Sequence, residues 1–180
     1  MKLKLQGKRI YLSALEREDC RKLYEEFEYD FNAPAETLNI GFSVENSDKW
    51  FEEIQSLQGN TNVRLGIFLN DGTVIGDVAL QNIDRENRKC DIGMGINKLE
   101  HRCKGYGKEA VTLMLDYGFD QLGLERIEAN TLSLNIPAQK SLEKLGFTLE
   151  GIQRKAVYIF GKKADRYMYA ILKEEFSGCK

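Results

Sequence analysis

Apolar and polar residues follow two different periods along this chain, and the period changes at short breaks rich in glycine, asparagine and aspartate. Alternating patterns and short apolar runs with β-branched and aromatic residues are typical of strands. They predict seven strands, at residues 9–14, 63–69, 74–80, 90–96, 126–132, 147–156 and 165–172. Asn70-Asp71-Gly72, between the second and third of these, predicts a tight β-hairpin.

Apolar residues three or four positions apart predict four helices between the strands. The first begins at residues 16–19, whose acidic side chains suit the positive end of a helix dipole. The second covers residues 48–58, the third residues 108–122, and the fourth lies between the strands at 126–132 and 147–156. Residues that suit helix ends flank them: Asn46 or Ser47 and Asn135 as N-terminal caps, Gly123 and Gly146 as terminators.

The predicted order is β-α-α-β-β-β-α-β-α-β-β. Residues 30–45 have no periodicity, residues 82–89 read as a polar turn, and the last two strands are joined by a loop around Gly161. No repeat, linker or change of composition divides the 180 residues, so we expect residues 1–180 to form a single domain.

Composition excludes several classes of protein. The chain is 42% hydrophobic and 30% charged, with no apolar run of membrane-spanning length, and its first residues lack the pattern of a secretory signal. A net charge of -2 gives no general attraction to nucleic acid. The cysteines, at positions 20, 90, 103 and 179, are irregularly spaced and accompanied by one histidine, which argues against a metal site or a disulfide framework. We therefore expect a cytoplasmic protein with reduced thiols.

A glycine-containing turn, Arg102-Cys103-Lys104-Gly105-Tyr106-Gly107-Lys108, stands between the strand at 90–96 and the helix at 108–122. A turn that leads into a helix leaves amide groups unpaired at the positive end of the helix dipole, so it attracts anions. The glycines let backbone amides approach a phosphate closely, and the basic side chains add charge. This pattern predicts a site for a pyrophosphate.

Arg-x-x-Gly-x-Gly between a strand and a helix resembles the coenzyme A motif of the GCN5-related N-acetyltransferases (GNAT). The segment from Asn135 to Phe147, with Ala138, Glu143-Lys144 and Gly146-Phe147, is similar to a second motif of that family, in the form seen among ribosomal-protein N-terminal acetyltransferases. The resemblance implies an α+β fold with a mixed, mostly antiparallel sheet flanked by helices. It also implies direct transfer of an acetyl group from acetyl-CoA to a primary amine within a ternary complex.

The resemblance assigns coenzyme binding to two further places besides the turn. In the family the strand before the turn separates from the strand after the next helix, and the pantothenate arm pairs with the exposed edge; here this implies the backbone of Met94, Gly95 and Ile96. Gly93 and Gly95 suit close approach of another backbone, although a β-bulge would also explain them. The full implied set is Met94, Gly95, Ile96, Arg102, Cys103, Lys104, Gly105, Tyr106, Gly107, Lys108 and Asn135.

Asp91 is the leading candidate for the general base. It stands eleven residues before Arg102, which matches a catalytic glutamate of the histone-type members when the strand is aligned without gaps. At about 3.3 Å per residue it lies roughly 10 Å from Met94, a distance suited to action through a water. The alternative is a solvated carboxylate at the start of a strand.

The proton donor to the departing thiolate is less clear from the sequence. Many relatives carry a tyrosine seven residues after the motif asparagine, where this chain has Leu142. Ser141 is the nearest hydroxyl, although it projects about a quarter-turn from that helix face. Tyr158, Tyr106 or water remain open as alternatives. His101, the single histidine, is expected on the surface near the phosphates.

The charge pattern suggests two sides to the site. Residues 16–30 hold seven acidic side chains against three basic ones, and residues 98–108 hold four basic against one acidic. An acidic side would suit a cationic amine and a basic side a polyphosphate, although a solvated helix face also explains the acids. The acceptor, a protein N-terminus or a small-molecule amine, is left open, as is the choice between monomer and homodimer.

Two other functions compete with this interpretation. The turn also fits the dinucleotide pattern G-x-G-x-x-A, with Glu125 twenty residues after Gly105, but the strand ends at Ile96 instead of running into the turn. A module of the same fold that binds acyl-CoA without catalysis is the second alternative, and Leu142 prompts it.

Overall fold

The computed structural model describes residues 3–35 and 43–178, so Cys179 and part of the aperiodic stretch at 30–45 lie outside the described residues. The described strands form one sheet in the order β1-β2-β3-β4-β5-β6-β8-β7, in which only the β5–β6 pair is parallel. The strands are β1 (Lys4–Gln6), β2 (Ile10–Ser13), β3 (Val63–Leu69), β4 (Val74–Asp84), β5 (Lys89–Ile96), β6 (Arg126–Leu132), β7 (Thr148–Ile159) and β8 (Lys162–Leu172). The α-helices are α1 (Arg17–Glu25), α2 (Asn46–Leu57), α3 (Tyr106–Asp116) and α4 (Ile136–Lys144).

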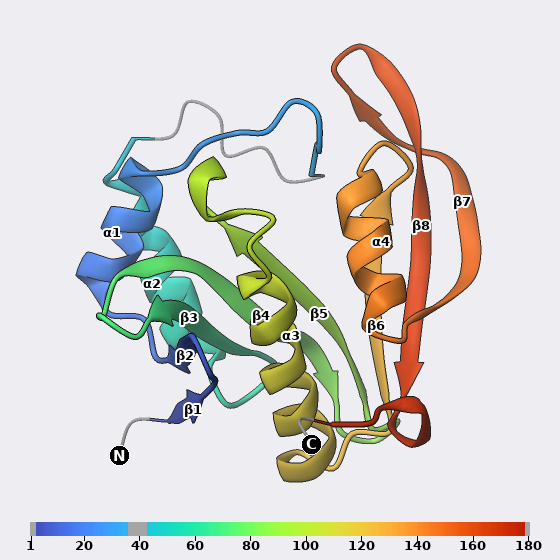
Figure 1. Cartoon of the computed structure of the whole chain (residues 1–180), viewed down its shortest axis with the longest axis horizontal. Helices are drawn as coiled ribbons and strands as arrows, with labels where there is room; N and C mark the ends of the chain where they lie inside the picture. The colour runs from blue at the N-terminus through green and yellow to red at the C-terminus, as the bar shows by residue number, and fades with distance from the viewer. Residues whose placement is uncertain (1–2, 36–42, 179–180) are drawn as a thin grey trace.

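Helices cover both faces of the sheet. In Figure 1, α3 and α4 stand in front of the strands, and α1 and α2 lie behind them. The larger apolar core joins α3 to β2 through β6 and β8, whereas a smaller cluster lies under α1 and α2 around Leu23, Ile54 and Phe68. The mixed, mostly antiparallel sheet flanked by helices confirms the predicted fold.

The two parallel strands separate soon after they begin. β5 pairs with β6 only over Lys89↔Arg126, Cys90↔Ile127 and Asp91↔Glu128, and from there β5 follows β4 while β6 follows β8. Figure 1 shows β5 passing behind α3 and β6 behind α4. We call this region the strand splay; it gives β5 a free edge beyond Asp91.

The element boundaries differ from the sequence prediction in several places. The predicted polar turn at 82–89 is wrong in its first half, because β4 continues to Asp84 through a register shift that lets Asn82 adopt a φ of 51° and keeps Ile83 buried. The helix predicted at 108–122 begins two residues earlier, at Tyr106, and changes to a π-helix over Tyr117–Gln121. Strand β1 was not predicted, because it is three residues long and only its middle residue, Leu5, is partly buried, too little to form a pattern.

Helix caps were predicted with mixed success. Asn135 does cap α4, with its Oδ1 accepting from the Ala138 amide at 3.1 Å. Gly146 follows α4 with a φ of 94°, as a left-handed terminator requires. The cap predicted for α2 is wrong: Glu45 precedes the helix, and the buried Ser47 hydroxyl donates to the Val44 carbonyl instead. The last loop is also shorter than expected, since β7 and β8 extend to Ile159 and Lys162 on either side of it.

Candidate functional site

The turn before α3 presents a run of unpaired amide groups. Gly105 has a φ of 85° and Cys103 a φ of 58°, both in the left-handed region, and the first helical hydrogen bond is Glu109 N to Gly105 O at 3.1 Å. The six amides from Cys103 to Lys108 therefore have no acceptor among the described residues. Amides that alternate through left-handed and helical conformations converge on an anion, and the helix dipole reinforces them.

Basic side chains flank this turn and extend into solvent. Lys104 and Lys108 are exposed, as is the Cys103 thiol. The ring of Tyr106 packs against Arg9, whose guanidinium carbon lies 5.0 Å from the ring centroid. The charge and the free amides together suit two or more phosphate groups.

An ion pair between Arg9, just before β2, and Glu109 of α3 clasps the turn. The Glu109 carboxylate accepts from the amides of Lys8 at 2.6 Å and Arg9 at 2.9 Å, and from the Arg9 Nε at 3.1 Å. Arg9 in turn donates from Nη1 to the Lys104 carbonyl at 2.7 Å. A Cβ at Gly7 would clash with Glu109 Oε1, so glycine there lets the carboxylate reach both amides. Sequence reasoning missed this clasp, because its two halves lie a hundred residues apart.

The clasp lowers the pKa of Glu109. Burial alone would raise the pKa of this carboxyl, but the Arg9 and Lys8 amides and the Arg9 guanidinium outweigh it and hold the pKa below the ordinary value of 4.5. Glu109 is therefore a carboxylate at neutral pH and acts as an acceptor of hydrogen bonds only.

The free edge of β5 lies next to the turn. The Asn97 amide donates to Ile75 of β4, so alternation along the strand turns the N–H and C=O of Met94 and Ile96 away from β4 and toward the splay. Gly95, also predicted to bind the coenzyme, turns its N–H and C=O to β4 instead. The side chain of Met94 meets the turn directly, because a Cβ at Gly107 would lie 2.6 Å from Met94 Cε.

Gly93 and Gly95 are not explained by a bulge. The β4–β5 register is regular from Gly76↔Ile96 to Gln81↔Asp91, so that alternative is wrong. No protein atom crowds them either: the nearest contacts of a Cβ would be Gln81 Oε1 at 4.0 Å for Gly93 and Asp77 Oδ1 at 3.9 Å for Gly95. These glycines leave open space on the sheet face that lies opposite α3.

A buried ion pair stands beneath that open space. The Asp77 carboxylate, 15% exposed, pairs with Arg64, whose guanidinium also lies 5.7 Å from the Trp50 ring centroid. Burial raises the pKa of Asp77, and the attraction of Arg64 opposes that rise only in part. The sequence showed Asp77 only as one polar residue in a strand.

Arg102 does not point its donors into the turn. Its Nε donates to the Ile96 carbonyl and its Nη2 to the Glu28 carbonyl, each at 2.9 Å, and its Nη1 lies 3.9 Å from Asp30 Oδ2. His101 beside it is less exposed than predicted, with 17% of its side chain accessible and its Nε2 3.5 Å from Glu100.

Asp91 lies where the two strands begin to separate. It is the last β5 residue paired with β6, and its Oδ2 accepts from Asn82 Nδ2 at 2.8 Å. Its register partner Glu128 points to the same face of the sheet and is held by Arg126 at 2.7 Å and Lys89 at 3.6 Å. The carboxylate of Asp91 is thus oriented by an amide and has no cation paired with it among the described residues.

The candidates for the proton donor are dispersed. Ser141 is half-buried on α4, and its hydroxyl has no partner within the described part of the chain. Leu142 beside it packs against the core. Tyr106 is engaged with Arg9, and Tyr158 is 71% exposed on the edge strand β7. Ser141 and Tyr106 are both half-buried, and among the described residues no group hydrogen-bonds to the hydroxyl of either.

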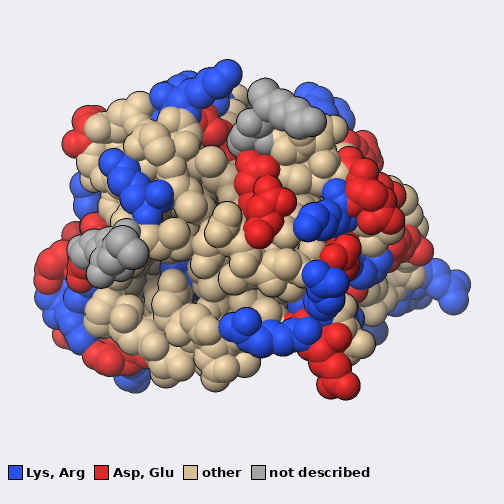
Figure 2. All heavy atoms as spheres, turned by 90° about the horizontal axis from the view of Figure 1, so that it is seen from below, with Lys and Arg blue, Asp and Glu red and all other residues tan. Residues whose placement is uncertain are grey.

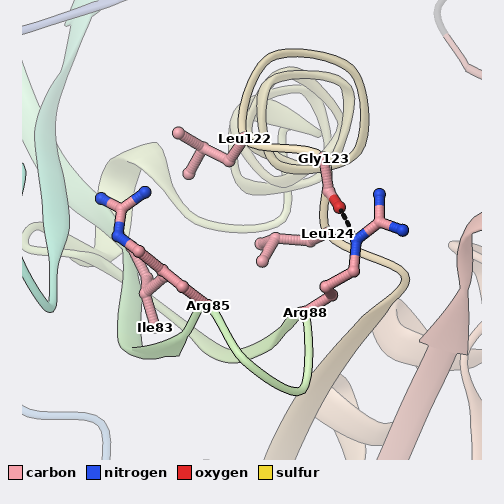
Figure 3. A pocket seen from close by; sticks show the side chains of 6 residues that line it. All are labelled: Ile83, Arg85, Arg88, Leu122, Gly123 and Leu124. Carbon is pink, nitrogen blue, oxygen red and sulfur yellow. Dashed lines mark hydrogen bonds between the residues drawn. The ribbon is translucent and has the colours of Figure 1, made fainter.

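Other parts of the described surface offer less. A hollow between β4 and the end of the π-helix is lined by two arginines, but Arg85 donates to Gly59 O and Arg88 to Gly123 O (Figure 3). Figure 2 shows charges of both signs interspersed over the face seen from below. Across residues 3–35 and 43–178 we find no cluster of three side chains able to hold a metal ion. No described helix combines the length and apolar character needed to cross a membrane.

The dinucleotide alternative does not match this geometry. A 3₁₀ turn, Leu99–His101, separates β5 from the glycines, and every described strand pair except β5–β6 is antiparallel. Glu125, which that reading required for a ribose, pairs with Arg88 at 3.1 Å. The parallel sheet that such a site needs is absent among the described strands.

Comparisons with known proteins show the family to which the chain belongs. Residues 9–148 match the family model described as "Acetyltransferase (GNAT) domain". The chain is 37% identical over 176 residues to the "Probable N-acetyltransferase YjcK" of Bacillus subtilis (strain 168), covering 93% of this chain and 96% of that protein. It is 27% identical over 173 residues to the spermidine N(1)-acetyltransferase of Escherichia coli (strain K12), covering 93% and 88%.

Solved structures share the fold. The spermidine N-acetyltransferase of Vibrio cholerae, in complex with CoA and spermine, superimposes with a TM-score of 0.80 at 24% identity, covering 94% of this chain and 98% of that one. The ribosomal-protein-S5-alanine acetyltransferase of Vibrio fischeri gives a TM-score of 0.82 at 21% identity, covering 97% and 99%.

Proposed function

The chain belongs to the acetyltransferase (GNAT) domain family and is an N-acetyltransferase, and from that premise we propose how its own residues hold acetyl-CoA and acetylate a primary amine. The observation that carries the proposal is the run of six unpaired amides at the α3 turn, placed beside the free edge of β5. The unpaired amides of the turn would bind a pyrophosphate, and the free edge of β5 would bind an arm that contains amide groups.

The coenzyme is held in two parts. The amides from Cys103 to Lys108, with the Lys104 and Lys108 side chains, bind the pyrophosphate. Met94 offers its N–H and C=O, and Ile96 its N–H, to the pantothenate arm across the splay, while the Ile96 carbonyl accepts from Arg102; Gly95 between them keeps the opposite face open. Asn135 contributes by fixing the start of α4, because its side chain is already committed to the Ala138 amide.

The chemistry needs a neutral amine and a way for the thiolate to leave. The amine nitrogen attacks the thioester carbonyl, the C–S bond breaks, and the acetyl group remains on nitrogen. Asp91, oriented by Asn82, accepts the amine proton through a water, and the Ser141 hydroxyl or water returns a proton to the sulfur. A weak base suffices, because an α-amine titrates near 7.7–8.0 and is partly neutral at pH 7.

The test of the coenzyme site is Gly105→Asp, measured by calorimetric titration with coenzyme A. A Cβ at this position would lie 2.9 Å from Arg9 Nη2, so the substitution would displace Arg9 and add a negative charge to the turn; coenzyme A binding should fall at least 100-fold. Gly72→Asp is the matched control: Gly72 also has a positive φ, 92°, and a Cβ there would have nothing within 4 Å. Equal coenzyme affinity in the parent and Gly105→Asp would contradict the assignment, provided that both fold.

A module that binds acyl-CoA without turnover is the second candidate, favoured only by the packed Leu142 at the position of a tyrosine donor. Steady-state release of free CoA in the presence of several primary amines separates the two. An enzyme releases CoA continuously with at least one amine, whereas a binding module releases none.

The remaining assignments follow from the sequence and its relatives. The acceptor is a protein N-terminus or a small-molecule amine; spermidine is a reasonable first probe, since two similar proteins bear its name. Free buried thiols at Cys20 and Cys90 support a reducing, cytoplasmic location. We infer that the activity requires no nucleic acid, membrane or metal ion. We also infer that the protein is a monomer or a homodimer.

A further inference from the structure

The motif arginine, Arg102, serves a neighbouring segment of chain rather than the turn itself. Its side chain is 26% exposed, and its two short hydrogen bonds go to the backbone carbonyls of Ile96 and Glu28. A side chain that binds phosphate would keep its guanidinium donors available, as Lys104 and Lys108 keep their ammonium groups. Residues 28–31, which follow α1, are therefore what Arg102 holds; we call them the bridge segment.

Backbone contacts fix the same end of the bridge segment. The Glu28 amide donates to the Asn97 carbonyl at 2.9 Å, and the Glu28 carboxylate accepts from the Leu99 amide at 2.6 Å. Asp30 Oδ2 lies 3.9 Å from Arg102 Nη1. Residues just after β5 thus hold the bridge segment at several points, and Arg102 is the one side chain among them that spans both β5 and the segment.

Aromatic rings fix the other end. Tyr29, Phe31 and Phe160 form a mutual cluster with ring centroids 4.9, 5.3 and 5.7 Å apart. Phe160 lies in the turn between β7 and β8, and β8 is the partner of β6. The bridge segment therefore joins the β5 side of the splay to the β6 side, and Figure 1 shows the chain after α1 passing over the top of the sheet toward the β7–β8 hairpin.

We propose that Arg102 is a positioning residue that holds the bridge segment across the wide end of the splay, and that this segment selects the acceptor rather than the coenzyme. The proposal rests on the function proposed above. Phe31 is 67% exposed and Phe160 47% exposed, and the residue before Phe31, Asp30, has a 25% exposed side chain whose Oδ1 accepts from the Asn32 amide at 2.9 Å and whose Oδ2 lies 3.9 Å from Arg102 Nη1. Bare aromatic rings beside a carboxylate suit an amine acceptor that carries a second cationic group.

The experiment compares Arg102→Lys with Arg102→Met. Lysine keeps the charge but, as a single ammonium, cannot span the Ile96 and Glu28 carbonyls; methionine removes both the charge and the donors. In both variants we expect hydrogen exchange of the Glu28 amide, which donates to the Asn97 carbonyl, to be at least tenfold faster, and coenzyme A affinity to stay within about threefold. The KM for spermidine should rise at least tenfold in each, with a smaller change in kcat.

Lys104→Met is the matched control, since it removes an exposed cation from the same turn without touching the bridge segment. It should weaken coenzyme A binding and leave exchange of the Glu28 amide unchanged. Phe160→Ala tests the other end and should accelerate the same exchange without changing coenzyme affinity.

Two results would overturn the proposal. The first is unchanged exchange of the Glu28 amide in Arg102→Lys or in Phe160→Ala; the second is a tenfold loss of coenzyme A affinity in Arg102→Met that lysine restores. The second result would make Arg102 a phosphate ligand. A parent protein that binds no coenzyme A would refute the proposed function instead, because the exchange comparison requires no coenzyme.

Discussion

Removal of the Glu109 carboxylate tests how the coenzyme turn is held. In Glu109→Ala the Lys8 and Arg9 amides lose their acceptor, and the Arg9 guanidinium loses its partner. The Glu109 side chain is 17% exposed, so water replaces it only in part. Each amide left without a partner costs about 1 kcal/mol at the lower end of the usual range, and the half-exposed ion pair adds under about 1 kcal/mol.

These contributions sum to about 2–3 kcal/mol of unfolding free energy. For a domain of this size that corresponds to a fall in Tm of about 5–10 °C. Coenzyme A affinity should fall as well, by about 3–10-fold, because Arg9 is then no longer held against the Lys104 carbonyl beside Gly105. Thermal unfolding followed by circular dichroism and calorimetric titration with coenzyme A measure the two effects.

Glu109→Gln separates charge from hydrogen bonding and gives a pH signature. The folded pKa of Glu109 is below 4.5, so its extra stability is present at pH values above the unfolded pKa and is lost as pH falls through the lower, folded pKa. The difference in Tm between the parent and Glu109→Gln should therefore be largest above about pH 5 and shrink toward pH 3. Asp120→Ala, at an exposed acid after α3, is the control and should stay within about 1 °C of the parent. A Tm for Glu109→Ala equally close to the parent would refute the clasp.

Three further outcomes are expected. Asp91→Asn should lower kcat by about 10²–10⁴ with acetyl-CoA affinity nearly unchanged, and an unaltered kcat near neutral pH would show that Asp91 is only a surface carboxylate. Ser141→Ala should lower kcat by less than tenfold if water can donate the proton; a 10³-fold loss of kcat with coenzyme still bound would identify the serine as the acid. Leu142→Tyr should leave kcat unchanged or raise it where the pocket admits the ring. In a Cys179→Ser background, an aromatic disulfide reagent at pH 8 should modify Cys103 alone, and coenzyme A should slow that reaction; equal rates with and without coenzyme would contradict its place in the site. The thiols of Cys20 and Cys90 should not react, because burial raises the pKa of each to about 12.

Local pattern determined much of this protein. The periods of apolar residues predicted seven of the eight described strands and all four described α-helices in the right order, because each element buries one face and must repeat its apolar residues accordingly. Asn135 and Gly146 could be assigned to helix ends from their chemistry alone, since caps act over three or four residues. The turn with Gly105 was also predicted, because its anion-binding character resides in adjacent amides.

Long-range contacts were decided by the tertiary structure. The Arg9–Glu109 clasp and the Arg102–Glu28 contact join residues far apart in the chain, and no periodicity encodes which carbonyl a guanidinium will reach. The same limit explains the π-helix after Asp116 and the continuation of β4 past Gln81, where packing overrides local preference. The splay of β5 from β6 came from resemblance to a family, not from the residues of either strand. Its physical origin is pairing: β5 follows β4 and β6 follows β8, so the two can share only three register positions before they diverge.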